Sequence, residues 1–198
     1  MENRTDEQLL ADHLSGRTDA FDLLVRRYVP ELYGFLARFV GNGSTADDLV
    51  QETFVQVHLA AASFDRDRAF KPWLYTIAAN KARDYMRSRG RRQEVTLDAG
   101  RDDSGLSAGE SVAADEAPLG EDAEREERKV AVRALVDRMP EHLRMILMLG
   151  YFQQLPYADI AEILDIPVGT VKSRLHAAVN HFADLWKRHS NENEMVKR

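Results

Sequence analysis

The stretch LPYADIAEILDIPVGTVKSRLHAAV, residues 155–179, predicts two helices joined by a tight corner. Apolar residues recur at helical spacing in its first half, at Tyr157, Ile160, Ala161 and Leu164. Asp165 stands where the chain must turn, because short polar residues tolerate sharp backbone turns better than branched ones do. Pro167 has a preset φ and no N–H group, so it suits the first position of the second helix. The pattern indicates a helix-turn-helix.

The second helix of this pattern has two stripes. One is apolar and is expected to be buried: Val171, Leu175, Ala178 and Phe182. The other is polar and is expected to face a ligand: Gly169, Lys172, Ser173, His176 and Asn180. Because a helix-turn-helix places its second helix in the major groove, the polar stripe predicts contact with DNA. The alternative is a surface helix on which Lys172 and Arg174 only maintain solubility.

Composition excludes several kinds of site. The 198 residues include no Cys, so disulfides, zinc fingers and cysteine nucleophiles are excluded, which fits a reducing cytoplasm. The longest apolar block, residues 145–152, is far shorter than the ~20 residues that span a bilayer, and the first residues lack the apolar run of a secretory signal. His176 and His181 diverge around a helix, and the sequence has no HExxH motif or Gly-rich phosphate loop. We therefore expect no metal, no cofactor and no enzymatic activity.

The formal net charge of −6 is an average over unlike segments. Residues 98–127 hold eleven acidic residues against two arginines, which is a local charge of −9. Residues 66–92 hold nine Lys and Arg against two Asp, which is +7. The acidic segment has almost no large apolar residues and predicts a flexible linker over 93–125, whereas the basic segment indicates a nucleic-acid partner.

Helical periodicity continues on both sides of this linker. Four helices are predicted before it: one around Leu9–Leu14, one from Phe21 to Phe39 interrupted at Pro30, one capped by Ser44 or Thr45 and running to about Ala62, and one from near Pro72 to about Arg89. After about Glu126 the helical period returns, breaks at Met139-Pro140 and leads into the helix-turn-helix, and the tail from Lys187 is expected to fray. The predicted fold class is all-α, with two small helical domains, residues 1–92 and 126–198, on a flexible acidic tether.

The helix from near Pro72 has a basic outer face. Four residues spaced by four, three and four share it: Asn80, Asp84, Arg87 and Arg91. Arg neutralises phosphates without reading sequence, whereas an Asn amide can bond a base edge in two places. This face therefore combines phosphate-binding groups with a candidate base-reading group. Phe64 and Phe70 flank the loop before the helix, and aromatic walls beside a basic groove hold unstacked bases. The alternative is that both Phe rings are core residues.

The helix that begins near Ser44 has the opposite character. Acidic and amide residues crowd its start, with Leu49, Phe54 and Val55 interleaved: Asp47, Asp48, Gln51 and Glu52. An acidic, partly apolar helix in a protein that grips DNA is a candidate docking face for another protein. The alternative is an ordinary solvated helix start, where acids are favoured by the helix dipole.

Three blocks in order resemble a known family. They are TADDLVQETF (45–54), FKPWLYTIAANKARDYMR (70–87) and LVDRMPEHLRMILMLGYFQQLPYADIAEILDIPVGTVKSRL (135–175). They are similar to the conserved regions of bacterial sigma factors of the extracytoplasmic-function group, and the resemblance covers roughly residues 20–92 and 131–182. It implies a first domain that melts and reads the minus-ten element as single strand, and a second that reads the minus-thirty-five element as duplex. It also implies that the linker enters the RNA path of the polymerase.

The resemblance assigns roles to residues of this chain. Docking on core RNA polymerase would use Asp47, Asp48, Leu49, Gln51, Glu52 and Phe54. Minus-ten DNA would meet Phe64, Arg66, Arg68, Phe70, Lys71, Asn80, Lys81, Arg83, Asp84, Arg87 and Arg91. Minus-thirty-five DNA would meet Gly169, Thr170, Lys172, Ser173, Arg174 and His176. The implied partners are the beta-prime coiled coil and the beta flap of core polymerase, promoter DNA and an anti-sigma factor, with no small-molecule substrate and no membrane insertion.

One departure and one rival reading bear on this prediction. Where family members often have Arg at several positions of the recognition helix, this chain has Ala177, Ala178 and Val179, which predicts weaker duplex binding with a shallower salt dependence. The rival is an autonomous helix-turn-helix repressor or activator, which would dimerise and bind a palindrome without polymerase.

Overall fold

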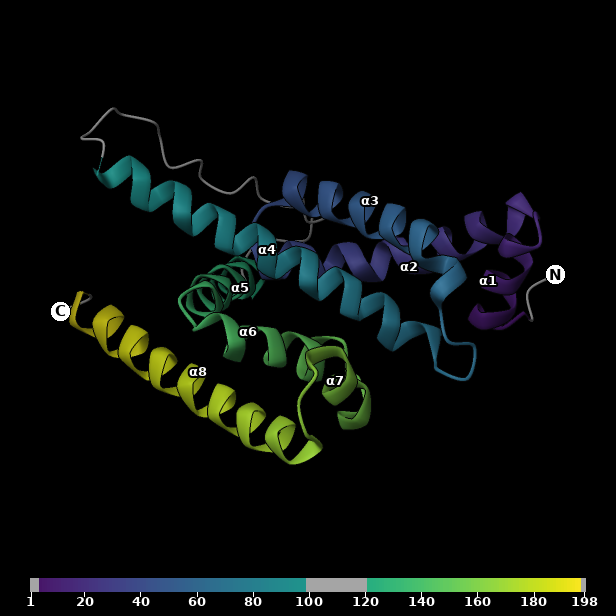
Figure 1. The fold of residues 1–198 in the computed structure, drawn as a ribbon. Coiled ribbons are helices and arrows are strands. Elements are labelled where there is room, and N and C mark those ends of the chain that lie inside the picture. The colour runs from purple at the N-terminus through teal and green to yellow at the C-terminus, as the bar shows by residue number, and fades with distance from the viewer. Residues whose placement is uncertain (1–3, 99–120, 197–198) are drawn as a thin grey trace. The chain divides into compact units, whose positions relative to one another are not determined.

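The structure, a computed structural model, describes residues 4–98 and 121–196, and every regular element in these ranges is a helix. This confirms the all-α prediction for that part of the chain. The chain divides into two compact units, which are described separately: one holds α1 to α4 and the other α5 to α8 (Figure 1). The middle of the predicted linker lies outside the described residues. At its two ends the structure has helix where a linker was predicted, because α4 continues to Asp98 and α5 begins at Glu121.

The first unit is a bundle of three long helices with a short helix at one end. Its elements are α1 (Asp6–Leu14), α2 (Thr18–Val40), α3 (Gly43–Ala60), the 3-10 turn η1 (Ala61–Ser63) and α4 (Phe70–Asp98). Helices α2, α3 and α4 lie side by side, and α1 packs near the start of α4 (Figure 1). The core lies between them and is formed by apolar residues that are fully buried: Leu9, Leu24, Leu32, Phe35, Phe39, Val57, Phe70, Leu74, Tyr75 and Ala78.

The connection between α2 and α3 shows how local chemistry sets the helix ends. Gly41 ends α2 with φ of 77°, a left-handed conformation that suits Gly because it has no Cβ. Asn42 then caps α3, because its side-chain oxygen accepts a 2.8 Å hydrogen bond from the N–H of Thr45. The sequence prediction of Ser44 or Thr45 as the cap was therefore wrong by two or three residues. Pro30 lies inside α2, which continues through it.

The second unit is built from α5 (Glu121–Asp137), α6 (Glu141–Leu147), the π-helical turn η2 (Met148–Phe152), α7 (Tyr157–Leu164) and α8 (Val168–Val196). Helix α6 is buried from residue 143 to residue 147 and packs against α8, which also contacts α5. Arg144 is 5% exposed and its guanidinium lies 3.5 Å from Asp137 at the end of α5. Helix α8 continues to Val196 and so includes most of the tail from Lys187 that was predicted to fray.

The corner between α7 and α8 has the predicted chemistry. Asp165 adopts φ of 51°, and the N–H of Ile166 bonds the carbonyl of Ala161 at 3.0 Å, which closes α7. The Pro167 carbonyl accepts the N–H of Thr170 at 2.8 Å and α8 begins one residue after Pro167. The helix-turn-helix is therefore confirmed.

Two further details fix how α7 and α8 pack. The buried face of α7 uses Ile160 and Ile163, whereas Tyr157, which was predicted to lie on it, is 42% exposed. Gly150 in η2 allows α8 to approach, because a Cβ there would lie 3.2 Å from Cδ1 of Leu175. The recognition helix is thus seated on η2 at the one residue of that turn that has no side chain.

Candidate nucleic-acid interface

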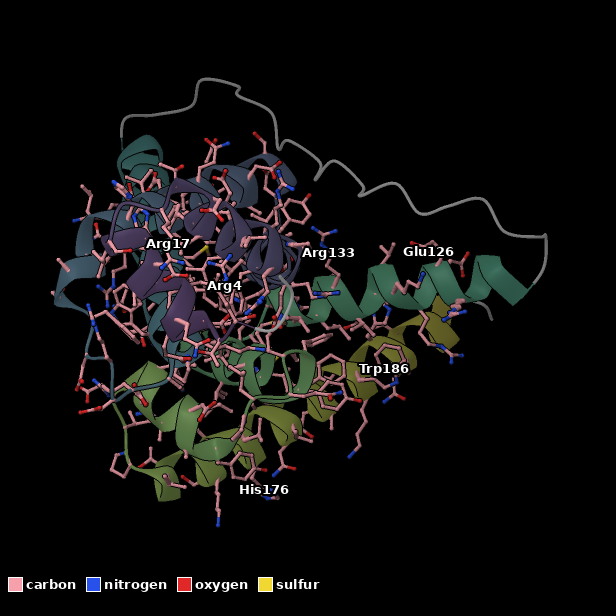
Figure 2. All side chains as sticks on the ribbon, turned by 90° about the vertical axis from the view of Figure 1, so that its right-hand side faces the viewer. Arg4, Arg17, Glu126, Arg133, His176 and Trp186 are labelled. Atoms are coloured by element: carbon pink, nitrogen blue, oxygen red, sulfur yellow. The ribbon has the colours of Figure 1, made fainter. Side chains whose placement is uncertain are left out.

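The outer face of α8 carries the polar stripe that the sequence predicted. Its exposed members are Gly169, Lys172, Ser173, His176 and Asn180, while Thr170 and Arg174 are half-buried. On the opposite side Val171 and Ala178 are fully buried. His176 points outward from α8 (Figure 2), and its Nε2 lies 3.0 Å from the Asn180 amide nitrogen. This face therefore offers one exposed ammonium and several hydrogen-bonding groups, a set that can contact phosphates and base edges.

The outer face of α4 is the second polar helix surface. Asn80, Asp84, Arg87 and Arg91 are all exposed, as predicted, and Leu74 and Ala78 face the core. The Arg83 guanidinium donates a 3.1 Å hydrogen bond to the Asn80 side-chain oxygen. This contact orients the Asn80 amide on the helix surface, where an oriented amide can discriminate between base edges.

The loop between η1 and α4, residues 64–69, holds the next group of predicted residues. Arg66 and Arg68 are exposed. The loop contains a turn in which the Asp65 side chain accepts the N–H of Asp67 at 3.1 Å and its carbonyl accepts the N–H of Arg68 at 3.1 Å. This Asx turn holds the two arginines at an exposed tip.

Phe64 and Phe70 have different environments. Phe70 is fully buried, with its ring centroid 5.6 Å from that of Tyr28, so the prediction that it lines a base pocket is corrected to a core role. Phe64 is half-buried, and its ring centroid lies 4.8 Å from that of Trp73. Trp73, which we did not select from the sequence, is also half-buried. The sequence signal that could have identified Trp73 is its position three residues after Phe70, on the same side of α4.

Two predicted DNA-binding lysines are engaged in ion pairs within the unit. Lys71 Nζ lies 2.6 Å from Glu31 Oε1 and 5.8 Å from the centroid of the Tyr75 ring. Lys81 Nζ lies 3.0 Å from Glu52 Oε2. Burial and the neighbouring Glu31 carboxylate raise the pKa of Tyr75 well above its usual range. In this structure both lysines neutralise carboxylates instead of presenting free cations.

The outer face of α3 differs from its prediction. Asp47, Asp48, Gln51 and Glu52 are exposed, but Leu49 and Phe54 are only 4% and 6% exposed. Leu49 and Phe54 are core residues, so the prediction that they contact another protein is corrected. The exposed apolar side chains of α3 are instead Val55, at 59%, and Leu59, at 70%. They share a face with Asp48 and Glu52 at spacings of four, three and four, a signal that the sequence contains and that we did not use for Leu59.

The described part of the chain contains no group of three or more His, Cys, Asp or Glu side chains placed to hold a metal ion. None of its helices combines the length and apolarity needed to cross a membrane.

Comparison with known proteins places this geometry in a family. The family model described as "Sigma-70 region 2" matches residues 24–92, and the model described as "Sigma-70, region 4" matches residues 129–182. The chain is 36% identical to the RNA polymerase sigma-H factor of Pseudomonas aeruginosa over 173 residues, which cover 87% of this chain and 89% of the relative. It is 35% identical to the ECF RNA polymerase sigma-E factor of Haemophilus influenzae over 177 residues, with coverage of 89% and 93%.

A solved structure shares the fold. It is that of the sigma factor RpoE in complex with the anti-sigma factor NepR from Bartonella quintana, with a TM-score of 0.63, 24% identity and coverage of 84% of this chain and 96% of that chain. The two family matches fall on the unit that carries α3 and α4 and on the unit that carries the helix-turn-helix. The chain therefore belongs to the sigma-70 family, in the extracytoplasmic-function group of RNA polymerase sigma factors, which direct promoter-specific initiation of transcription.

Proposed function

We propose that the two units divide promoter reading between them. The first unit docks on core polymerase through α3 and reads the minus-ten element as single strand through α4 and the loop 64–69. The second unit reads the minus-thirty-five element as duplex through α8. The observation that carries this proposal is the exposed stripe of α4, in which an oriented Asn80 amide stands among Asp84, Arg87 and Arg91. Arginines grip the backbone there while the amide reads a base.

The proposed docking surface on α3 combines charge and apolar area. Its residues are Asp47, Asp48, Gln51, Glu52, Val55 and Leu59, all exposed. Val55 and Leu59 can bury apolar area against a partner helix, while the acids select a basic partner and speed association. The beta-prime coiled coil of core polymerase is the proposed partner of this surface, and the beta flap is the proposed partner of the second unit.

The proposed minus-ten surface consists of the half-buried Phe64 and Trp73 pair, the exposed Arg66 and Arg68, and the α4 stripe. Unstacking one base costs a few kcal/mol, and one stacked base returns about 1 to 3 kcal/mol. The first unit alone therefore does not open duplex DNA, and core polymerase must hold the rest of the bubble. This dependence separates a sigma factor from an autonomous repressor.

Regulation by an anti-sigma factor is part of this proposal. The solved neighbour from Bartonella quintana is bound to one, and we extend that mode of control to this chain. A partner that co-purifies with the chain and releases it from core polymerase would support this; a partner that leaves the holoenzyme intact would argue against it. Because core polymerase and promoter DNA are the proposed targets, the proposed place of action is the cytoplasm, and no catalytic role is proposed.

The decisive experiment compares DNA binding with and without core polymerase. We expect tight binding to a premelted promoter fragment only when core polymerase is present. Tight duplex binding by the chain alone, on a palindrome, would overturn the proposal in favour of the repressor.

A point variant tests the role proposed for the Asn80 amide. Asn80→Ala is expected to reduce promoter-specific run-off transcription about tenfold, since a good bidentate base contact is worth about 1 to 3 kcal/mol. Binding to core polymerase should be unchanged. Gln56→Ala, which removes an exposed amide from α3, is the matched control. Equal loss of transcription and core binding in Asn80→Ala would show a structural role instead.

A further inference from the structure

The start of α4 is held by a residue that lies outside the region matched to the family. Glu7 belongs to α1, and the region 2 match begins only at residue 24. The Glu7 Oε1 atom accepts a 2.9 Å hydrogen bond from the backbone N–H of Phe70, the first residue of α4. The first N–H groups of a helix have no partner within the helix, and its N-terminus favours negative charge. Glu7 therefore caps α4 from another helix.

A closed set of contacts links α1, α2 and α4 at this point. Asp6, the neighbour of Glu7, accepts hydrogen bonds from the Tyr28 hydroxyl and from Arg27 of α2. The Tyr28 ring packs against the Phe70 ring, with centroids 5.6 Å apart. The Phe70 N–H returns to Glu7. Two consecutive carboxylates of α1 thus fasten α2 and α4, and they do so around a Phe70 side chain that is fully buried.

Helix α1 is itself firmly seated. Leu9 and Leu10 are each 1% exposed. Its first turn carries a capping box in which Thr5 and Gln8 exchange side-chain to backbone hydrogen bonds. Helix α1 therefore holds the Glu7 side chain in a fixed position at the start of α4.

The electrostatics of Glu7 agree with this role. Partial burial acts to raise the pKa of the Glu7 carboxyl, but the hydrogen bonds from the N–H of Phe70, from its own N–H and from Thr5 outweigh it, so the pKa lies below the usual value. The carboxylate is thus ionised at neutral pH, when it binds the helix N-terminus most strongly.

Phe70 is also where the loop 64–69 ends. At the other end the loop begins from η1, where the N–H of Phe64 bonds the Ala61 carbonyl at 3.2 Å and Ala61 is buried. Between these anchors residues 65–69 are exposed. A short loop with both ends fixed has few conformations, so the position of its last residue decides where Arg66, Arg68 and the Phe64 ring stand.

We propose that Glu7 is a positioning residue for minus-ten recognition: by capping α4 at Phe70 it sets the geometry in which the loop 64–69 meets the single strand. This rests on the proposed function of that loop. Glu7 itself need not touch DNA. It acts by preorganisation, so its loss should reduce discrimination between bases more than it reduces grip on the phosphates.

The test uses holoenzyme, assembled from the full chain and core polymerase, and a premelted DNA bubble whose non-template strand is randomised over six positions. Bound DNA is sequenced, and the enrichment of each base is measured. For Glu7→Ala we expect the strongest base preference to fall about fivefold or more, while the affinity for core polymerase is unchanged. Glu7→Gln keeps an acceptor oxygen and is expected to retain most of the preference. Asp22→Ala, which removes an exposed carboxylate from α2, is the matched control.

Two further readouts separate positioning from simple loss of structure. Hydrogen exchange of the amides of residues 64–70 should accelerate in Glu7→Ala, while the buried amides of α2 keep their protection. Glu7→Asp shortens the side chain by one methylene and is expected to fall between wild type and Glu7→Ala, which keeps the test valid if the Ala variant unfolds. Base preferences unchanged in both Glu7→Ala and Glu7→Asp would overturn the inference. A wild-type chain that enriches no base would instead overturn the proposed function of the loop.

Discussion

The Lys81 ammonium of α4 lies 3.0 Å from the Glu52 carboxylate of α3. One group belongs to the helix proposed to meet DNA and the other to the surface proposed to meet core polymerase. The helix proposed to meet DNA and the surface proposed to meet core polymerase are therefore joined by an ion pair, so that a change at Glu52 affects both.

Glu52→Gln is expected to release Lys81 and to strengthen non-specific binding of the chain to single-stranded DNA. One additional phosphate contact should steepen the salt dependence by about 0.7. Unfolding free energy should change by less than about 1 kcal/mol, because the pair is partly solvated. Asp48→Asn removes another exposed acid of α3, with no such effect expected on the salt slope. Fluorescence titration at several salt concentrations measures the salt slope of each variant. Identical slopes for Glu52→Gln and Asp48→Asn would show that Lys81 does not contact DNA even without its Glu52 partner.

Leu59→Ser is expected to weaken binding to core polymerase about tenfold or more, because Leu59 is 70% exposed and offers apolar area to a partner. Stability should change by less than about 0.5 kcal/mol, as for other exposed positions. Leu49→Ala, by contrast, should destabilise the unit by about 2 to 5 kcal/mol, because Leu49 is buried. Quantitative pull-down and thermal melting separate the two effects. Undiminished core binding by Leu59→Ser would remove Leu59 from the docking surface.

Phe70→Ala and Phe64→Ala should differ sharply. Phe70 is fully buried, so its truncation is expected to cost about 3 to 5 kcal/mol of unfolding free energy. Phe64 is half-buried against Trp73, and its truncation should cost less than about 2 kcal/mol while reducing affinity for a single-stranded oligonucleotide. Urea denaturation and oligonucleotide titration distinguish the variants. Equal destabilisation would mean that both rings are core residues.

Lys172→Ala is expected to lower the slope of log affinity against log salt by about 0.9 for duplex DNA, the value for one phosphate contact. Lys172 is exposed on the outer face of α8. Lys187→Ala, an exposed lysine four turns further along the same helix, is the control and should leave the slope unchanged. The measurement uses holoenzyme and a duplex that covers the minus-thirty-five element. An unchanged slope in Lys172→Ala would place this ammonium away from DNA.

Stability should fall as the pH is lowered, through His13. Its Nε2 lies 3.0 Å from Nδ1 of His58 on α3, and its ring packs on Phe21 of α2. The pKa of His13 is lowered mainly by burial and, to a smaller extent, by the charge of His58. The neighbouring carboxylate of Asp12 is already paired with Arg4 and Arg17. The unfolded chain therefore binds a proton at higher pH than the folded chain does. The free energy of unfolding should decrease as the pH falls below the ordinary His value of about 6.5, and level off below the lowered pKa.

His13→Gln should flatten this pH dependence between about pH 7.5 and about pH 5. His142→Gln, at an exposed position of α6, serves as the control and should leave it unchanged. Denaturation by urea at each pH provides the measurement. A pH profile of His13→Gln that overlays that of the wild type would assign the dependence to other groups.

The sequence by itself determined the features that depend on neighbours along the chain. Helical period, the turn at Asp165, the start of α8 next to Pro167 and the two stripes of that helix all follow from spacing and backbone preference, and the structure has them. Family membership followed in the same way, from three blocks in order.

Tertiary structure decided which side of each helix is available. Leu49, Phe54 and Phe70 have residue types and positions that suit either core or contact, and packing against neighbouring helices buried all three, while Val55 and Leu59 were left exposed. The pairing of Lys81 with Glu52, and of Glu7 with the Phe70 amide, joins residues 29 and 63 positions apart. No local pattern encodes such contacts, because they exist only once α1, α3 and α4 are packed together.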